Sequence, residues 1–135
     1  HKAKILSVGD SRAYLIDAQG KWQQITQDHS ILSELLTDFP DKKEEDFATI
    51  YGGVSSCLVA DYSEFQDKIF YQEIEIQQGE SLLLCSDGLT DGLSEEMREK
   101  IWQKYPDDKD RLTVFRKMIE KQSFSDDLSV IMCAF

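Results

Sequence analysis

The sequence predicts an α+β domain with a mainly antiparallel sheet. Short apolar segments come first, one helical segment interrupts them, and two amphipathic helices precede a last strand. The regular alternation of strand and helix that builds a parallel sheet is missing from this order. A length of 135 residues suits one compact domain.

Three short strands are expected in the first part of the chain. Residues 5–8 and 13–17 flank a turn at residues 9–12, and residues 22–25 follow a second turn at residues 18–20. Apolar runs separated by Gly, Asp and Ser are typical of β-hairpins, so we expect a hairpin at each turn.

A helix is expected next, in residues 28–39. Its apolar side chains form one stripe, and either Asp28 or Ser30 suits the N-cap position. The mixed-charge run at residues 41–46 is interpreted as an exposed loop or a short surface helix.

Two strands are expected in the middle of the chain. Residues 68–76 partly alternate, with apolar positions at Ile69, Tyr71, Ile74 and Ile76, which predicts one solvated face. Residues 81–85, SLLLC, are nearly all apolar and predict a strand buried on both faces.

The last third predicts two helices and a strand. Ser94 suits the N-cap of the first helix, whose apolar stripe is expected at Met97, Ile101 and Tyr105. Asp107 or Asp108 is expected to cap the second. Its apolar face comprises Leu112, Phe115, Met118 and Ile119, and residues 128–135 are predicted to form a buried strand.

Composition excludes several classes of protein. With 26 acidic and 15 basic residues, the net charge of −11 argues against nucleic acid and anionic membranes as partners. No apolar run approaches the roughly 18 residues of a membrane span. Three cysteines without a CxxC pair indicate neither a disulfide framework nor a zinc site, and Cys85 and Cys133 are expected in the core of a reduced, cytoplasmic protein.

Acidic residues stand at the ends of three apolar segments. Asp10 lies in the first turn, Asp87 and Asp91 follow SLLLC, and Asp126 and Asp127 precede the last strand. If these strands are neighbours, the carboxylates converge and suit a hard divalent ion such as Mg²⁺ or Mn²⁺. Turn and N-cap roles, which Asp also favours, remain the alternative on spacing alone.

Four motifs carry a resemblance to a known family. They are VGDSRAYLI, DHS, LLLCSDGLTDGLS and DDLSVIMCAF, in this order. The sequence resembles the C-terminal half of the metal-dependent PP2C-type (PPM) serine/threonine protein phosphatases, in their bacterial form. The likeness spans nearly the whole chain and is weakest over residues 39–78. It implies a partial PP2C-like β-sandwich, with antiparallel sheets flanked by helices and the N-terminal part of the domain absent.

The resemblance also implies a site. In the family, a dinuclear Mg²⁺ or Mn²⁺ centre activates a water that hydrolyses phosphoserine and phosphothreonine. Asp87 and Asp126 match metal ligands. Asp10 and Asp91 match acids near an additional metal or its water shell, and Asp127 is expected to orient its neighbour. Gly88 is expected to let the backbone pass close to a metal or phosphate.

Three further polar residues are expected to be structural. Ser11 and Arg12 fit the family pattern and are expected to shape the first hairpin, while His29 is interpreted as part of a turn and not as a general acid.

The family's bridging aspartate and phosphate-binding arginine belong to an N-terminal half that has no counterpart in these 135 residues. We therefore expect no catalytic residue beyond the metal ligands, and residues 1–135 to be the C-terminal part of a single domain. A start at His1, almost directly before a strand, agrees with an excised piece. Such a piece would hold about half of the metal site. The implied partners are phosphorylated proteins, and a serine/threonine kinase or its targets.

Two other interpretations of the acidic motifs are possible. Haloacid dehalogenase-like phosphatases also place Asp and Gly after a strand, but their nucleophilic carboxylate would stand where this chain has Cys85, two positions before Asp87. A non-catalytic PP2C-like binding or regulatory module remains the main alternative. The four retained carboxylates, of Asp10, Asp87, Asp91 and Asp126, favour the enzyme over it.

Overall fold

Two antiparallel sheets form the framework of the computed structural model, which describes residues 1–47, 53–57, 69–122 and 126–135. One sheet has two strands, and the other has four in the order β3-β2-β5-β6. The smaller sheet pairs β1 (Lys2–Ser7) with β4 (Phe70–Glu75). The larger contains β2 (Arg12–Ile16), β3 (Trp22–Gln24), β5 (Ser81–Cys85) and β6 (Val130–Ala134).

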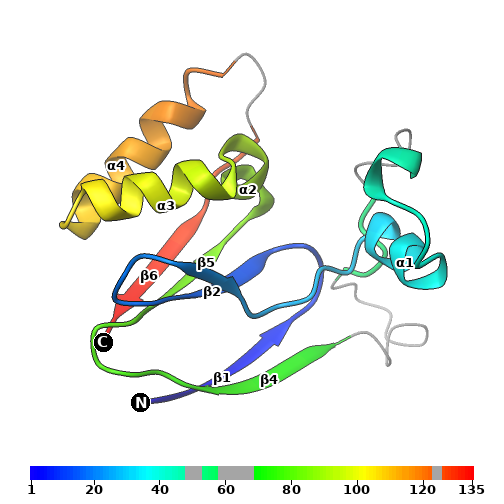
Figure 1. Ribbon diagram of the computed structural model, residues 1–135, viewed down its shortest axis with the longest axis horizontal. Helices are drawn as coiled ribbons and strands as arrows, with labels where there is room; N and C mark the ends of the chain where they lie inside the picture. Colours follow the sequence, from blue (N-terminus) through cyan, green and yellow to red (C-terminus); the bar gives the residue numbers. More distant parts are fainter. Residues whose placement is uncertain (48–52, 58–68, 123–125) are drawn as a thin grey trace.

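The helices lie mainly on one side of this framework. They are α1 (Ile31–Asp38), the 3-10 helix η1 (Glu44–Phe47), α2 (Asp87–Gly92), α3 (Glu95–Lys104) and α4 (Asp108–Ile119). Helices α2 to α4 cover one face of the four-stranded sheet, the β1–β4 sheet lies across the other face, and α1 stands to the side (Figure 1). This arrangement confirms the predicted α+β class. No helix in the described ranges combines the length and apolar character needed to cross a membrane.

The hairpin predicted around residues 9–12 is wrong, because the chain leaves one sheet there and enters the other. Strand β1 pairs with β4, whereas β2 pairs with β3 and β5. Gly9, at φ +100°, supports the crossing. Its N–H donates to His29 Nδ1 at 3.1 Å, and its carbonyl accepts from the His29 N–H at 2.9 Å. The second predicted hairpin, β2–β3, is confirmed.

The larger core lies between the four-stranded sheet and helices α2 to α4. Tyr14, Trp22 and Leu83 from the sheet meet Trp102 and Phe115 from the helices. The ring centroids of Trp22 and Trp102 are 5.5 Å apart at an interplanar angle of 86°, an edge-to-face contact. This apolar layer holds α2, which begins at Asp87, against β5.

Predictions for the helices were mostly correct. Ser30, Ser94 and Asp107 accept backbone N–H bonds as N-caps of α1, α3 and α4. The short helix α2 was not predicted. Of the stripe expected on α3, Ile101 is buried and Tyr105 packs against the core, but Met97 is wrong, since it is 39% exposed and Arg98 and Trp102 complete the buried face.

Arg98 is the unexpected member of that face. It is 5% exposed, and its guanidinium carbon lies 5.0 Å from the Tyr14 ring centroid and 5.2 Å from that of Trp22. Stacking on two rings compensates part of the cost of burying its charge. The apolar stem of Arg98 also extends the buried face, which explains why hydrophobic periodicity missed it.

The smaller core lies between the two sheets and is only partly covered. Ile5, Ala13 and Ile25 are buried there, with Phe70 and Ile74 of β4 packed against them. Of the apolar positions predicted for this strand, Ile74 packs on the core and Ile76 is buried, whereas Ile69 and Tyr71 are 57% and 52% exposed. The predicted solvated face is therefore present, and it includes Tyr71.

Strands β5 and β6 are less buried than predicted. Leu83 and Cys85 face the helices, but Leu84 is 39% exposed, so β5 is not buried on both faces. In β6, Ile131 is 64% exposed and Cys133 is exposed, which corrects the predicted buried strand and the predicted core cysteine. The physical reason is that the described two-stranded sheet covers β2 and part of β5 and leaves β6 open.

Phe115 offers a test of the larger core. It is fully buried, so Phe115→Ala should lower the free energy of unfolding by about 3–5 kcal/mol through lost contacts and a cavity. Urea denaturation followed by circular dichroism would measure the loss. Met97→Ala, on an exposed part of α3, should change stability by less than about 1 kcal/mol. Equal effects of the two substitutions would contradict this description of the core.

Candidate metal centre

The strand pairings bring the predicted acidic residues to one edge of the four-stranded sheet. Arg12 at the start of β2 pairs with Cys85 at the end of β5, and Cys85 pairs with Val130 at the start of β6. Asp10 precedes β2, Asp87 follows β5, and Asp126 precedes β6. All three therefore leave the sheet at the same edge. Asp91 lies one helical turn beyond Asp87 on α2.

The pKa of Asp87 reflects the nearby acidic residues. Burial raises its pKa, and the negative charges of Asp10, Asp126 and Asp91 raise it further. A hydrogen bond from the Gly88 backbone opposes the shift in part. The negative charges that raise the pKa of Asp87 lie close enough to repel its carboxylate, which is the arrangement expected where a cation binds.

The chain around Asp87 is tied to the segment before β6. Ser86 donates its N–H to the Ser129 carbonyl and its Oγ–H to the Asp127 carbonyl, each at 3.0 Å. The same Oγ accepts the Ser129 N–H at 3.0 Å. These bonds continue the β5–β6 pairing past its last residue pair.

Gly88 is required for this close approach. A Cβ atom at position 88 would lie 2.5 Å from the Asp127 carbonyl oxygen, well inside van der Waals contact. The sequence predicted that this glycine lets the backbone pass close to a metal or phosphate. The neighbour that the structure places there is the protein's own Asp127 carbonyl.

Asp126 is oriented by main chain. The Asp127 N–H donates to Asp126 Oδ1 at 2.7 Å, while the residue itself is exposed. The role predicted for Asp127, to orient its neighbour, stays a prediction, and the contact that the structure shows is made by the Asp127 backbone amide.

A second pair of side chains stabilises the same end of the sheet. Arg12 Nε lies 3.0 and 2.9 Å from the two carboxylate oxygens of Asp28, and Nη2 lies 2.5 Å from Oδ2. This bidentate contact raises the pKa of Arg12. Arg12 was expected to shape a hairpin. It instead joins the start of β2 to Asp28 through an ion pair. Of the two N-caps predicted for α1, Asp28 and Ser30, the structure has Ser30.

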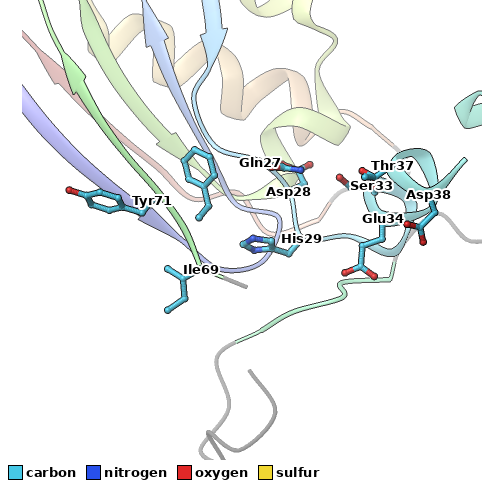
Figure 2. Close-up of a pocket in the computed structure, with 10 residues that line it drawn as sticks. Gln27, Asp28, His29, Ser33, Glu34, Thr37, Asp38, Ile69 and Tyr71 are labelled. Carbon is cyan, nitrogen blue, oxygen red and sulfur yellow. The ribbon is translucent and has the colours of Figure 1, made fainter. Parts of the chain in front are cut away.

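His29 bonds to Gly9, where the chain passes from one sheet to the other, and also lines a hollow on the surface. The hollow has a volume of about 600 Å³ and is bounded by His29, by Glu34 and Asp38 of α1, and by Ile69 and Tyr71 (Figure 2). Since Nδ1 of His29 accepts the Gly9 N–H, one ring nitrogen is engaged in holding the turn next to Asp10. This agrees with the structural role predicted for His29.

Cys85 does not supply a nucleophile. Burial raises the pKa of its thiol to about 11, an effect that the charges of Arg98 and Arg12 oppose only in part. The thiol is therefore protonated near neutral pH, and the thiolate is the reactive form. This adds to the sequence argument against an enzyme that uses the residue two positions before Asp87.

The chemical type of the candidate ligand atoms suits a hard divalent cation. It consists of carboxylate oxygens, which Mg²⁺ and Mn²⁺ prefer. Among the described residues, no group of three or more His, Cys, Asp or Glu side chains is close enough to hold a metal ion. The described carboxylates are therefore compatible with ligands for such an ion and do not by themselves form a complete site.

The contacts of the Ser86 hydroxyl could not be predicted from the sequence. A serine at the end of an apolar strand is common, and the sequence holds no sign that its hydroxyl reaches across to the segment before β6. The contact depends on the β5–β6 pairing, which joins residues far apart along the chain.

Comparison with known proteins places this geometry in a family. A sequence model of protein phosphatase 2C (PP2C) matches residues 1–129. The chain belongs to the PP2C family. The serine/threonine phosphatase stp of Listeria innocua is 30% identical over 128 residues, which are 95% of this chain and 50% of that protein. The PP2C chain thus spans about half the length of the curated relatives it matches.

Solved structures show the same fold. The serine/threonine phosphatase of S. agalactiae superposes with a TM-score of 0.78 at 21% identity, covering 99% of this chain and 55% of that one. At that identity the likeness concerns the fold alone. The catalytic domain of the serine threonine protein phosphatase PstP was solved in complex with two manganese ions. It superposes with a TM-score of 0.62 at 25% identity, covering 87% of this chain and 46% of that one.

The raised pKa of Asp87 yields a prediction for the metal-free PP2C chain. The unfolded chain has an ordinary Asp pKa, so charging Asp87 costs folding stability once pH exceeds that value. In EDTA at pH 7, Asp87→Asn should raise the melting temperature. The gain should disappear as pH falls below the ordinary Asp pKa of about 3.9. Thermal unfolding across pH measures it, and a variant less stable than wild type at pH 7 would contradict the repulsion.

Proposed function

We propose that this chain carries part of the active site of a metal-dependent protein serine/threonine phosphatase, a phosphoric monoester hydrolase. One observation carries the proposal: Asp10, Asp87, Asp91 and Asp126 converge at one edge of the sheet in a PP2C chain. The relatives that it matches are named as serine/threonine phosphatases, which supports the same activity for the protein that contains this chain.

In this proposal, Asp87 and Asp126 hold a divalent metal through their carboxylate oxygens. Asp10 and Asp91 bind an additional metal or order its water, and Asp127 orients Asp126. The chemistry that Mg²⁺ or Mn²⁺ supplies when bound is a lowered pKa of water, which makes it a nucleophile toward a phosphate ester. A related catalytic domain solved with two manganese ions supports a centre of this kind.

The substrates of the proposed enzyme are phosphoserine and phosphothreonine in proteins. Its partners would be a serine/threonine kinase or the targets of that kinase, which assigns the protein to signalling in the cytoplasm. The net charge of −11 supports a protein partner over nucleic acid or an anionic membrane.

We further propose that residues 1–135 are the C-terminal part of one PP2C domain that other residues complete. Leu84 and Ile131 pair across β5 and β6 and are 39% and 64% exposed toward the space between the sheets. A cleft of about 520 Å³ lies beside them. Exposed apolar residues next to an open cleft support a surface that another part of the domain covers.

Hydrolysis of p-nitrophenyl phosphate tests the activity. Mn²⁺-dependent turnover should appear in a chain extended upstream of His1 and be weak or missing in the 135-residue chain. Asp87→Asn should lower the rate by about 100-fold or more, since even residues behind a metal ligand cost 10–100-fold. Asp110→Asn, an exposed aspartate on the first turn of α4, is the matched control and should leave the rate unchanged.

The other outcomes separate the alternatives. Activity of the short chain that Asp87→Asn removes would mean that the missing ligands come from within it or from a second copy. No activity in either chain would overturn the enzyme and favour a PP2C-like binding or regulatory module. Full activity of Asp87→Asn would contradict its role as a metal ligand.

Ile131→Lys tests the completion of the domain. In the 135-residue chain, where Ile131 is exposed, the substitution should leave stability nearly unchanged and reduce self-association. In the extended chain it should lower the free energy of unfolding by about 2–5 kcal/mol, the cost of losing a buried isoleucine. Burial of the ammonium group adds to that cost.

The control for this comparison is Met97→Lys, which changes a 39% exposed apolar residue on α3. It should have little effect in either chain. Denaturation and analytical ultracentrifugation measure stability and self-association. If Ile131→Lys is as harmless in the extended chain as in the short one, the proposed covering of β6 is contradicted.

A further inference from the structure

We infer that Ser86 is a positioning residue for the proposed metal centre, whose hydroxyl sets the separation between the carboxylates of Asp87 and Asp126. The inference rests on the proposed function and extends it to a residue that binds neither metal nor substrate. Three hydrogen bonds of one residue carry it, two of them through the hydroxyl.

Ser86 is placed to control both carboxylates. It directly precedes Asp87 in the chain, and its Oγ–H donates to the carbonyl of Asp127, the residue after Asp126. The Asp127 amide in turn donates to Asp126 Oδ1 at 2.7 Å. A continuous path through the Ser86 side chain and the backbone of Asp127 therefore joins the two candidate ligands.

The hydroxyl acts in two directions at once. It donates to the Asp127 carbonyl and accepts from the Ser129 amide, both at 3.0 Å, so it fixes two points of the segment before β6. Regular β5–β6 pairing ends at Cys85 and Val130. Beyond that pair, the described hydrogen bonds that join the two segments all come from Ser86.

The segment that Ser86 holds is limited on one side only. Its approach to α2 is limited by the Asp127 carbonyl, which already lies against Gly88. Since regular β5–β6 pairing ends at Cys85 and Val130, the described hydrogen bonds that keep the segment from moving away are those of Ser86. Their loss should let Asp126 move away from Asp87 and weaken a shared metal site.

Ser86→Ala tests the inference, with Ser86→Thr as the conservative variant that keeps the hydroxyl. Mn²⁺ affinity is measured in the extended chain from the electron paramagnetic resonance signal of free Mn²⁺. We expect Ser86→Ala to weaken binding by about 10–100-fold and Ser86→Thr to bind close to wild type. Ser81→Ala, which removes a hydroxyl from the opposite end of β5, is the matched control and should bind as wild type.

A metal-free measurement isolates the contact itself. The Ser129 amide donates to Ser86 Oγ, so its hydrogen exchange should be faster in Ser86→Ala than in wild type in EDTA. Distant amides in α4 should exchange at the wild-type rate, which excludes general unfolding as the cause.

Each remaining outcome decides against the inference. Wild-type Mn²⁺ affinity in Ser86→Ala, or equal losses in the Ala and Thr variants, would overturn the role of the hydroxyl while leaving the metal centre intact. An unchanged Ser129 exchange rate would show that the contact is not made. A wild-type extended chain that binds no Mn²⁺ would overturn the inference and the proposed function together, and that result is distinguishable because it does not depend on Ser86.

Discussion

Strand β5 is the element on which the rest of the described structure depends. It pairs with β2 on one side and β6 on the other, and its Leu83 and Cys85 enter the core that holds α2, α3 and α4. Because both pairings are antiparallel and reach Cys85, the start of β2, the end of β5 and the start of β6 coincide in space. The location of the acidic residues is a consequence of this register. A shift of one residue would move every side chain to the other face and separate the carboxylates.

The negative charges around Asp87 raise its pKa, so the ionised form of Asp87 opposes folding in the absence of a cation, and nearby contacts hold the surrounding segments in place. The Ser86 bonds and the close approach at Gly88 hold the segment before β6, while Arg12 and Asp28 form a bidentate ion pair at the start of β2. The neutralisation of Asp28 by Arg12 also removes one further negative charge from this end of the sheet. The neighbourhood therefore combines acids of like charge with hydrogen bonds, a close backbone approach and an ion pair that connect the segments bearing them.

Helices and their caps could be predicted from the sequence, because they depend on residues a few positions apart. Strand pairing and packing between distant segments could not. Apolar periodicity identified α4, and side-chain capping identified Ser94 and Asp107, since both depend on residues within a few positions. Strand-end aspartates correctly indicated a shared edge. The hairpin expected at Gly9 failed because a glycine turn does not reveal whether the next strand stays in the same sheet. The predicted burial of Ile131 and Cys133 is wrong because hydrophobicity indicates which face of a strand favours burial. It does not indicate whether the described residues pack against that face.

The crossing at Gly9 has a consequence for how this chain folds. It sends β1 away from its neighbour in sequence, so that Ser7 pairs with Phe70 and Lys2 with Glu75. Closing that pairing requires the ends of a long intervening segment to meet, and the entropy of loop closure must be overcome before any contact is gained. The β2–β3 hairpin and the α3–α4 pair involve residues close in sequence and can form early. The two-stranded sheet should therefore assemble later than these local elements, together with the equally distant β2–β5 pairing, and the space between the sheets closes only when both are formed.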